Sequence, residues 1–262
     1  MSEAAPDLQD DAWAALDAEL DAWQAAGRTA TAWWRDDDAT RPGPKLDRLL
    51  ALSVKTKAPV ALAVIPARAE AALAPALAAC PGASVLQHGY AHVNHAPRGQ
   101  GLGAWELGLH RGRAAVLDDL AAGRDRFGDI LDDRFVRVVA APWNRIDPVL
   151  FPDLPGLGFR GVTAFGARAA ARPVPGLHVN HGHCDPIDWK RETFAGTRKA
   201  VAQVIEHLEA RRTGSADPDE ATGLLTHHAD MDAATWDFAE ALLGRLTAHP
   251  AVRFVDARDL FA

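Results

Sequence analysis

The chain has 262 residues, of which 48% are apolar and 24% charged, and its formal net charge at pH 7 is -7. This composition is typical of a soluble globular protein that forms one barrel-sized α/β domain or two small domains. No apolar run is long enough to cross a bilayer, and the acidic balance excludes a surface that follows nucleic acid phosphates. We therefore expect neither a membrane nor a nucleic acid as a partner, and the sequence leaves the oligomeric state open.

The first thirty residues are acidic and lack the basic start and apolar core of a secretory signal peptide, which indicates a cytoplasmic protein. The two cysteines, Cys80 and Cys184, are far apart and indicate no disulfide framework. Apolar residues at steps of three and four from Trp13 to Trp23 predict an amphipathic helix over about residues 7–26, packed on the outside of the fold.

After this helix, strand and helix patterns alternate along the chain. The expected strands are residues 31–37, 58–66, 83–88, 136–142, 160–165, 176–180, 222–228 and 252–256. The expected helices are Pro44–Val54, Ala67–Ala79, a stretch within Trp105–Phe127, about Arg191–Arg212, and Ala233–Ala248.

Several of these strands are apolar without alternation, as in a parallel sheet that is covered on both faces. No linker or change in composition divides the chain, so we predict a single domain over residues 1–262, a closed or nearly closed βα barrel. An open doubly wound sheet is the alternative, although no glycine-rich phosphate loop follows the first strand.

Histidines and aspartates gather where predicted strands end. Of 11 histidines, eight fall in three short segments, at residues 88–95, 178–183 and 227–228. The carboxyl ends of the strands in a parallel barrel open on one face, where such folds place their active sites. Distant segments of the chain are therefore expected to meet there.

The aspartate run at residues 36–38 is either a solvated turn or a site that needs carboxylates close together. His88 and His92 can present two imidazoles, which with one carboxylate form an open three-ligand metal site, although one histidine capping a loop is an alternative. One aspartate would then bind the metal and its neighbour would accept a proton from water. The charge of the metal ion would offset the repulsion within the run.

These segments resemble the motifs of the polysaccharide deacetylase family, the NodB homology group of metal-dependent carbohydrate esterases, and a cytoplasmic bacterial subgroup of it. The resemblance implies a distorted (β/α) barrel with about seven parallel strands. It also implies that Asp37 is the catalytic base and that Asp38, His88 and His92 hold a divalent metal, for which zinc is the simplest expectation. Iron, cobalt, nickel or manganese are alternatives.

Three later segments resemble the remaining motifs. Pro142-Trp143 matches the proline-aromatic pair, in which Trp143 lines the groove and its N–H donates to the oxyanion. Asp188-Trp189 matches the acid before tryptophan, and implies that Asp188 orients the general acid. That acid is His227 by the resemblance, with His228 as the alternative.

Two positions depart from the family pattern. Ala39 replaces the glycine after the aspartate pair, and Ala140 replaces the arginine that orients the base. Arg35, two residues before Asp37 and so on the same strand face, or Arg145 could supply the missing charge.

The implied function is a metal-dependent hydrolase that removes an N-acyl (acetyl) group from an amino sugar or glycan. The alternatives are a metal-dependent amidase acting on a small cytoplasmic N-acylated metabolite, and a non-catalytic carbohydrate-binding relative. A rival metal site is also possible in HVNHGHCDPIDW, formed by His181, His183 and either Cys184 or Asp185.

Overall fold

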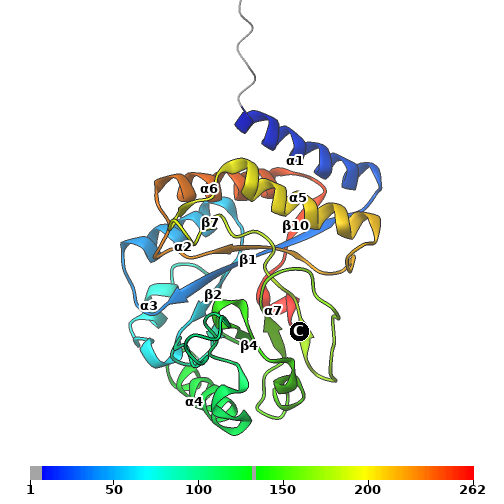
Figure 1. The fold of residues 1–262 in the computed structure, drawn as a ribbon. Helices are drawn as coiled ribbons and strands as arrows, with labels where there is room; N and C mark the ends of the chain where they lie inside the picture. Colours follow the sequence, from blue (N-terminus) through cyan, green and yellow to red (C-terminus); the bar gives the residue numbers. More distant parts are fainter. Residues whose placement is uncertain (1–7, 132–133) are drawn as a thin grey trace, which may run out of the picture.

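The structure, a computed structural model, describes residues 8–131 and 134–262. Within these ranges, eight strands pair in parallel in one curled sheet, and helices cover its outside (Figure 1). The strands of this sheet are β1 (Ala30–Ala39), β2 (Val60–Val64), β3 (Ala83–His88), β4 (Phe135–Ala140), β5 (Gly161–Thr163), β6 (His178–Val179), β9 (Thr222–Thr226) and β10 (Val252–Phe254). The α-helices are α1 (Leu8–Ala25), α2 (Pro44–Thr56), α3 (Leu73–Leu77), α4 (Arg113–Leu131), α5 (Thr197–Thr213), α6 (Ala233–Ala248) and α7 (Ala257–Leu260).

Shorter elements connect these strands and helices. The 3-10 helices are η1 (Pro66–Arg68), η2 (Leu109–Arg111), η3 (Pro142–Asn144) and η4 (Pro148–Asp153). A small antiparallel hairpin consists of β7 (Ile187–Asp188) and β8 (Thr193–Phe194).

The sheet order is β10-β1-β2-β3-β4-β5-β6, and β9 pairs with β1 as well. An isolated parallel bridge between Cys184 and Leu224 joins the segment after β6 to β9, which brings the curled sheet round on itself. The expected distorted (β/α) barrel of parallel strands is therefore confirmed. The sheet is irregular because β5 and β6 are only three and two residues long.

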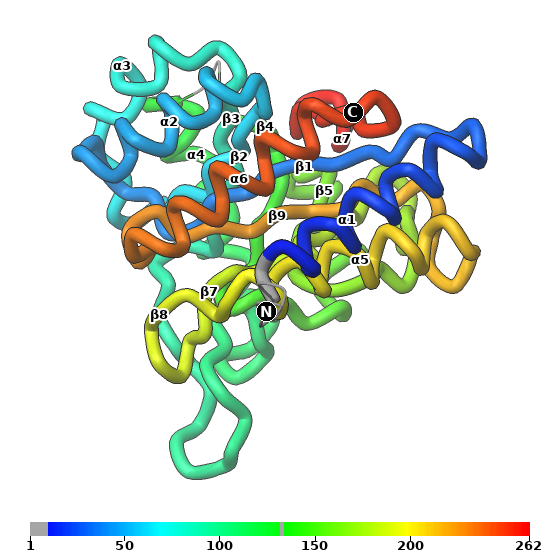
Figure 2. The backbone as a smooth tube through the Cα atoms, turned by 90° about the horizontal axis from the view of Figure 1, so that it is seen from above, coloured from blue at the N-terminus to red at the C-terminus, as the bar shows by residue number. Residues whose placement is uncertain are grey.

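The N-terminal helix α1 lies outside the barrel on α5, as Figures 1 and 2 both show. Three apolar side chains of this helix, Leu16, Leu20 and Trp23, are buried in the hydrophobic core. The Glu19 carboxylate receives two hydrogen bonds from Arg212 of α5, at 2.8 and 2.7 Å. No helix among residues 8–131 and 134–262 is long and apolar enough to span a bilayer.

Local chemistry sets where several helices begin and end. The helix α6 begins at its N-cap Asp232, whose carboxylate accepts a hydrogen bond from Thr235 N (2.8 Å). The helix α5 ends at Gly214, whose φ of 86° is in the left-handed region that glycine adopts at helix ends.

Trp33 and Trp34, adjacent on β1, are both buried, and their ring N–H groups donate to His181 O and Thr226 Oγ1.

Two predicted helices differ from the observed ones. The stretch 67–79 contains only η1 and α3, because Ala67 N and Glu70 N donate to carbonyls of other segments rather than within a helix. The helix expected from about Arg191 begins at Thr197, because residues 191–194 complete the β7–β8 hairpin.

Candidate active site

The backbone of β1 is irregular at the aspartate run. Asp38 has a left-handed φ of 69°, and the pairing with β2 shifts register between Asp36 and Ala39. A regular strand would send Asp36 and Asp38 to the same side. The irregularity separates them, so that Asp36 lies in the interior while Asp37 and Asp38 line a cavity.

Asp38, His88 and His92 meet at one end of this cavity. Asp38 Oδ1 lies 3.3 Å from His88 Nε2 and 3.4 Å from His92 Nε2. These separations exceed the 2.7–2.9 Å typical of a charge-assisted hydrogen bond, and Asp38 Oδ1 is buried without a hydrogen-bond partner. They are close to the spacing of about 3.3 Å between ligand atoms that share one tetrahedral zinc ion.

The tautomer of His88 also suits a metal ligand. His88 Nδ1 lies 3.1 Å from the carbonyl oxygen of Ala140. A carbonyl oxygen only accepts, so Nδ1 donates this hydrogen bond and Nε2 keeps a free lone pair toward Asp38. The donor set, with two imidazoles and one carboxylate, therefore fits a divalent metal ion.

The charges around this group favour a cation. Burial would raise the pKa of Asp38, but the nearby imidazoles of His88 and His92 outweigh burial and hold that pKa well below its usual range. Burial would lower the pKa of His88, but the Asp37 and Asp38 carboxylates outweigh it and raise that pKa. Both shifts arise because carboxylates and imidazoles lie close together and favour each other's charged form.

Arg35 is fully buried and forms a two-pronged ion pair with Asp37. Arg35 Nε lies 2.9 Å from Asp37 Oδ1, and Nη2 lies 3.1 Å from Oδ2. The guanidinium also donates to Thr163 Oγ1 (2.7 Å) and Asn144 Oδ1 (2.5 Å), which fix its plane. Arg35 therefore contacts the predicted base where the family's arginine is missing.

Arg145, the other arginine considered for this position, points elsewhere. Its Nη1 donates to Leu102 O and, at 3.4 Å, to Ala104 O. Its guanidinium lies over the Trp105 ring, 4.6 Å from the ring centroid. Arg145 thus holds the loop that follows β3.

The two histidines after β9 have different surroundings. His227 lines the cavity, with Nε2 3.9 Å from Asp37 Oδ2 and its ring 4.6 Å from the Trp189 ring. His228 instead lies against Asp36, with Nδ1 2.5 Å from Asp36 Oδ1. Of the two histidines considered as the general acid, His227 is the one that lies beside Asp37.

Asp188 does not line the cavity. Its neighbour Ile187 on β7 does, and side chains alternate along a strand, so the Asp188 carboxylate lies on the other side and accepts from Lys190 N (3.1 Å). Asp185 lines the cavity in its place. Burial raises the pKa of Asp185, and the charge of nearby His227 partly offsets that rise.

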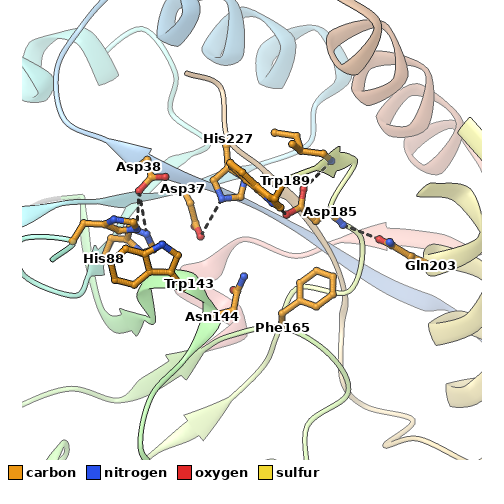
Figure 3. Close-up of a pocket in the computed structure, with 12 residues that line it drawn as sticks. Asp37, Asp38, His88, Trp143, Asn144, Phe165, Asp185, Trp189, Gln203 and His227 are labelled. Carbon is orange, nitrogen blue, oxygen red and sulfur yellow. Dashed lines mark hydrogen bonds and ion pairs between the residues drawn. The ribbon is translucent and has the colours of Figure 1, made fainter. Parts of the chain in front are cut away.

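The cavity has a volume of about 540 Å³. Its lining residues are Asp37, Asp38, His88, His92, Trp143, Asn144, Phe165, Asp185, Ile187, Trp189, Gln203 and His227. Figure 3 shows Asp38 at one end, Gln203 at the other and His227 between them. The proton-transfer candidates therefore lie in the middle of the cavity, next to the candidate metal-ligand group of Asp38, His88 and His92.

Three large aromatic side chains at the cavity are exposed: Trp143 (36%), Phe165 (40%) and Trp189 (48%). Flat aromatic faces that remain open to solvent beside a cavity are suited to stacking on sugar rings. Trp143 and Asn144 have left-handed φ values of 53° and 57°. Such costly conformations cluster at functional sites, where the surrounding structure holds them.

The rival metal site in the segment after β6 does not assemble. Cys184 is buried, burial raises its pKa far above the usual range, and its Sγ donates to Ala200 O (3.3 Å). His181 Nδ1 accepts a hydrogen bond from a backbone N–H. Asp185 belongs to the cavity described above.

His183 does lie close to His207 and Glu220, with each Nε2 3.4 Å from a Glu220 oxygen. However, His183 Nδ1 accepts from Gly223 N (2.9 Å), so its Nε2 carries the proton and has no lone pair for a metal. The two rings stack at 3.3 Å with 13° between their planes, so their in-plane lone pairs lie in separate, nearly parallel planes and do not meet at one point. We interpret this group as a buried polar cluster.

Sequence reasoning missed four lining residues: Asn144, Phe165, Ile187 and Gln203. Asn144 directly follows Trp143 in the proline-aromatic motif, which could have indicated it. Gln203 is a mid-helix residue of α5, whose amide oxygen accepts from Asp185 N (2.9 Å), and no local pattern marks it.

The sequence matches no protein-family model and no curated protein. Among solved structures, a candidate polysaccharide deacetylase from Mycobacterium smegmatis matches with a TM-score of 0.61 and 16% identity over 86% of both chains. A Streptococcus mutans CE4 esterase matches at 0.56 and 13% identity, over 91% of this chain and 90% of the other. The Bacillus subtilis peptidoglycan deacetylase PdaC matches at 0.52 and 18% identity, over 89% of this chain and 90% of the other. This protein therefore has the fold of the polysaccharide deacetylases and CE4 esterases.

Proposed function

We propose that the protein is a metal-dependent deacetylase that removes an N-acetyl group from an amino sugar or glycan. The observation that carries the proposal is one cavity in which Asp37, held by Arg35, lies between the Asp38–His88–His92 group and His227. Structures of the same fold include a peptidoglycan deacetylase and a CE4 esterase, which supports a carbohydrate substrate. The exposed aromatic rings at the cavity also favour a sugar.

Asp38, His88 and His92 would hold the metal ion. Two imidazoles and one carboxylate suit zinc, and the same donors also accept iron, cobalt, nickel or manganese. When bound, a divalent ion supplies a Lewis acid that polarises the acyl carbonyl and activates water.

The protein's own groups would move the protons. Asp37 accepts a proton from the attacking water, and the Arg35 guanidinium keeps its carboxylate oriented. The Trp143 backbone N–H donates to the oxygen that becomes negatively charged. His227 then donates a proton to the leaving amine, and Asp185, rather than Asp188, is the second carboxylate that lines the cavity with it.

The contact between Arg35 and Asp37 also bears on the non-catalytic alternative. The absence of the family's arginine would favour that alternative, but a buried arginine from β1, Arg35, contacts Asp37 instead.

The single domain over residues 1–262 and the cytoplasmic location remain predictions from the sequence.

Acetate release tests the proposal. Metal-free protein and protein reloaded with Zn²⁺ are incubated with N-acetylglucosamine oligomers and, separately, with small N-acetylated amides. We expect acetate from the oligomers only after reloading, and none from Asp37→Asn protein. Release from the small amides alone would instead identify an amidase, and no release from any substrate would contradict the proposal.

A further inference from the structure

The Glu106 carboxylate supports the loop that contains both histidines of the metal-ligand group. Glu106 is buried, with only 1% of its surface exposed. Its Oε1 accepts from Ala91 N at 2.8 Å and its Oε2 accepts from Tyr90 N at 3.3 Å. Both N–H groups belong to the three residues between His88 and His92, so a single carboxylate binds the middle of the ligand loop.

The loop has a tight conformation that needs this support. Gly89 has a φ of 53°, and a Cβ at this position would lie 2.1 Å from Glu106 Oε2 and 2.5 Å from Pro142 Cγ. His92 has a φ of 56°, in the left-handed region that costs a non-glycine residue about 1–3 kcal/mol. Hydrogen bonds from the loop to an ionised acceptor are stronger than those to neutral ones and offset such a cost.

Glu106 is itself held in place by the segment that follows Trp143. It lies in the long segment between β3 and α4, part of which projects from the body of the molecule (Figure 2). Arg145 donates to Leu102 O and Ala104 O within this segment, and Leu107 forms a parallel bridge with Ile146. The segment containing Glu106 is thus attached to the residues that directly follow Trp143 and Asn144.

We propose that Glu106 is the positioning residue for the metal site. Its carboxylate sets the His88–His92 loop so that both Nε2 atoms face Asp38 before the ion binds, and this inference rests on the proposed metal-dependent function. The role needs two acceptor oxygens on one side chain, because two adjacent N–H groups donate to it. Glutamine offers only one acceptor oxygen and turns its NH2 group toward the second N–H.

The test uses Glu106→Gln in the full-length, metal-free protein, with Co²⁺ and Zn²⁺ as probes. We expect the Kd for either ion to rise about 10- to 100-fold, as is typical when a group that orients metal ligands is lost. The visible absorption of bound Co²⁺ should also change, because a displaced histidine alters the ligand geometry. Glu206→Gln, which removes the same charge from an exposed position on α5, should leave both measurements unchanged.

A second variant and a second measurement keep the test decisive if Glu106→Gln folds poorly. Glu106→Asp keeps the charge but shortens the reach, and should also weaken metal binding. Hydrogen exchange at the Ala91 amide, measured without metal, should be faster in both variants than in the parent protein. Wild-type affinity and Co²⁺ spectrum in Glu106→Gln would overturn the positioning role alone, whereas a parent protein that binds neither ion would overturn the proposed function as well.

Discussion

The Asp36 carboxylate and the His228 ring form a buried pair, with Oδ1 and Nδ1 2.5 Å apart. Asp36 Oδ2 also accepts from the Thr226 hydroxyl at 2.6 Å and from His228 N at 3.0 Å. The pair joins the carboxyl ends of β1 and β9. Asp36 directly precedes Asp37, and His228 directly follows His227. Of the three consecutive aspartates, Asp36 therefore has a structural role, while Asp37 and Asp38 face the cavity.

Asp36→Ala should destabilise the fold strongly, because it leaves the His228 ring buried without its partner. We expect the free energy of unfolding to fall by about 3–5 kcal/mol, as when one member of a buried ion pair is removed. Urea denaturation measures this change. Asp230→Ala, at an exposed position nearby, should change the free energy by less than about 0.5 kcal/mol, and equal effects of the two variants would contradict the structural role.

Arg35→Gln should abolish most of the turnover, because Asp37 loses the two-pronged ion pair that orients it. We expect a loss of about 10²- to 10⁴-fold, comparable to that of Asp37→Asn. Steady-state kinetics at saturating metal give the comparison. Arg145→Gln should keep most of the turnover, since Arg145 contacts the loop after β3 and not the base; equal losses in the two arginine variants would refute the assignment.

Asp185→Asn should lower kcat more than Asp188→Asn does. Asp185 lines the cavity beside His227, whereas the Asp188 carboxylate accepts a backbone hydrogen bond in the β7–β8 hairpin. Circular dichroism spectra of both variants serve as the folding control. A larger loss of kcat in Asp188→Asn would restore the role that the sequence motif implies for Asp188.

Protein stability should fall in mild acid because of two buried histidines. Burial lowers the pKa of His181 and of His183 to about 4, from an ordinary value of 6.5. Between these values the unfolded chain binds protons that the folded chain does not, so this stability is complete above the unfolded pKa and is lost as the pH falls. At a pH of about 5, each histidine should account for a loss of about 2 kcal/mol.

Urea denaturation at a pH of about 7.5 and of about 5 measures this loss. His183→Gln should lose about 2 kcal/mol less than the parent protein between the two conditions, whatever its stability at the higher pH. The same loss in both proteins would show that His183 does not titrate as its burial requires.

The barrel could be predicted from the sequence because strands such as β2 are continuous apolar runs. All five residues of β2, VALAV, are apolar and buried, and a strand covered on both faces has this pattern. The hairpin β7–β8 could not be predicted, since two-residue strands leave no periodic signal. The helix expected from about Arg191 consequently included residues that form the hairpin.

That Asp38, His88 and His92 lie together was predicted from the family motifs, but the residues that support them were not. Asp38, His88 and His92 occur at strand ends in short motifs. Glu106, in contrast, is 16 residues from Tyr90, whose N–H donates a hydrogen bond to it. The choice between Asp185 and Asp188 depends on which of the two carboxylates faces the cavity, and the sequence does not specify this. Arg35 and Arg145 were both compatible with the sequence, because only the fold shows which guanidinium reaches Asp37.

The most direct test of the account is anomalous diffraction from a crystal of the protein soaked in Zn²⁺. The account predicts one strong zinc peak in the cavity, within coordination distance of Asp38, His88 and His92. A peak located instead at His183, His207 and Glu220, or no peak beside Asp38, would contradict it.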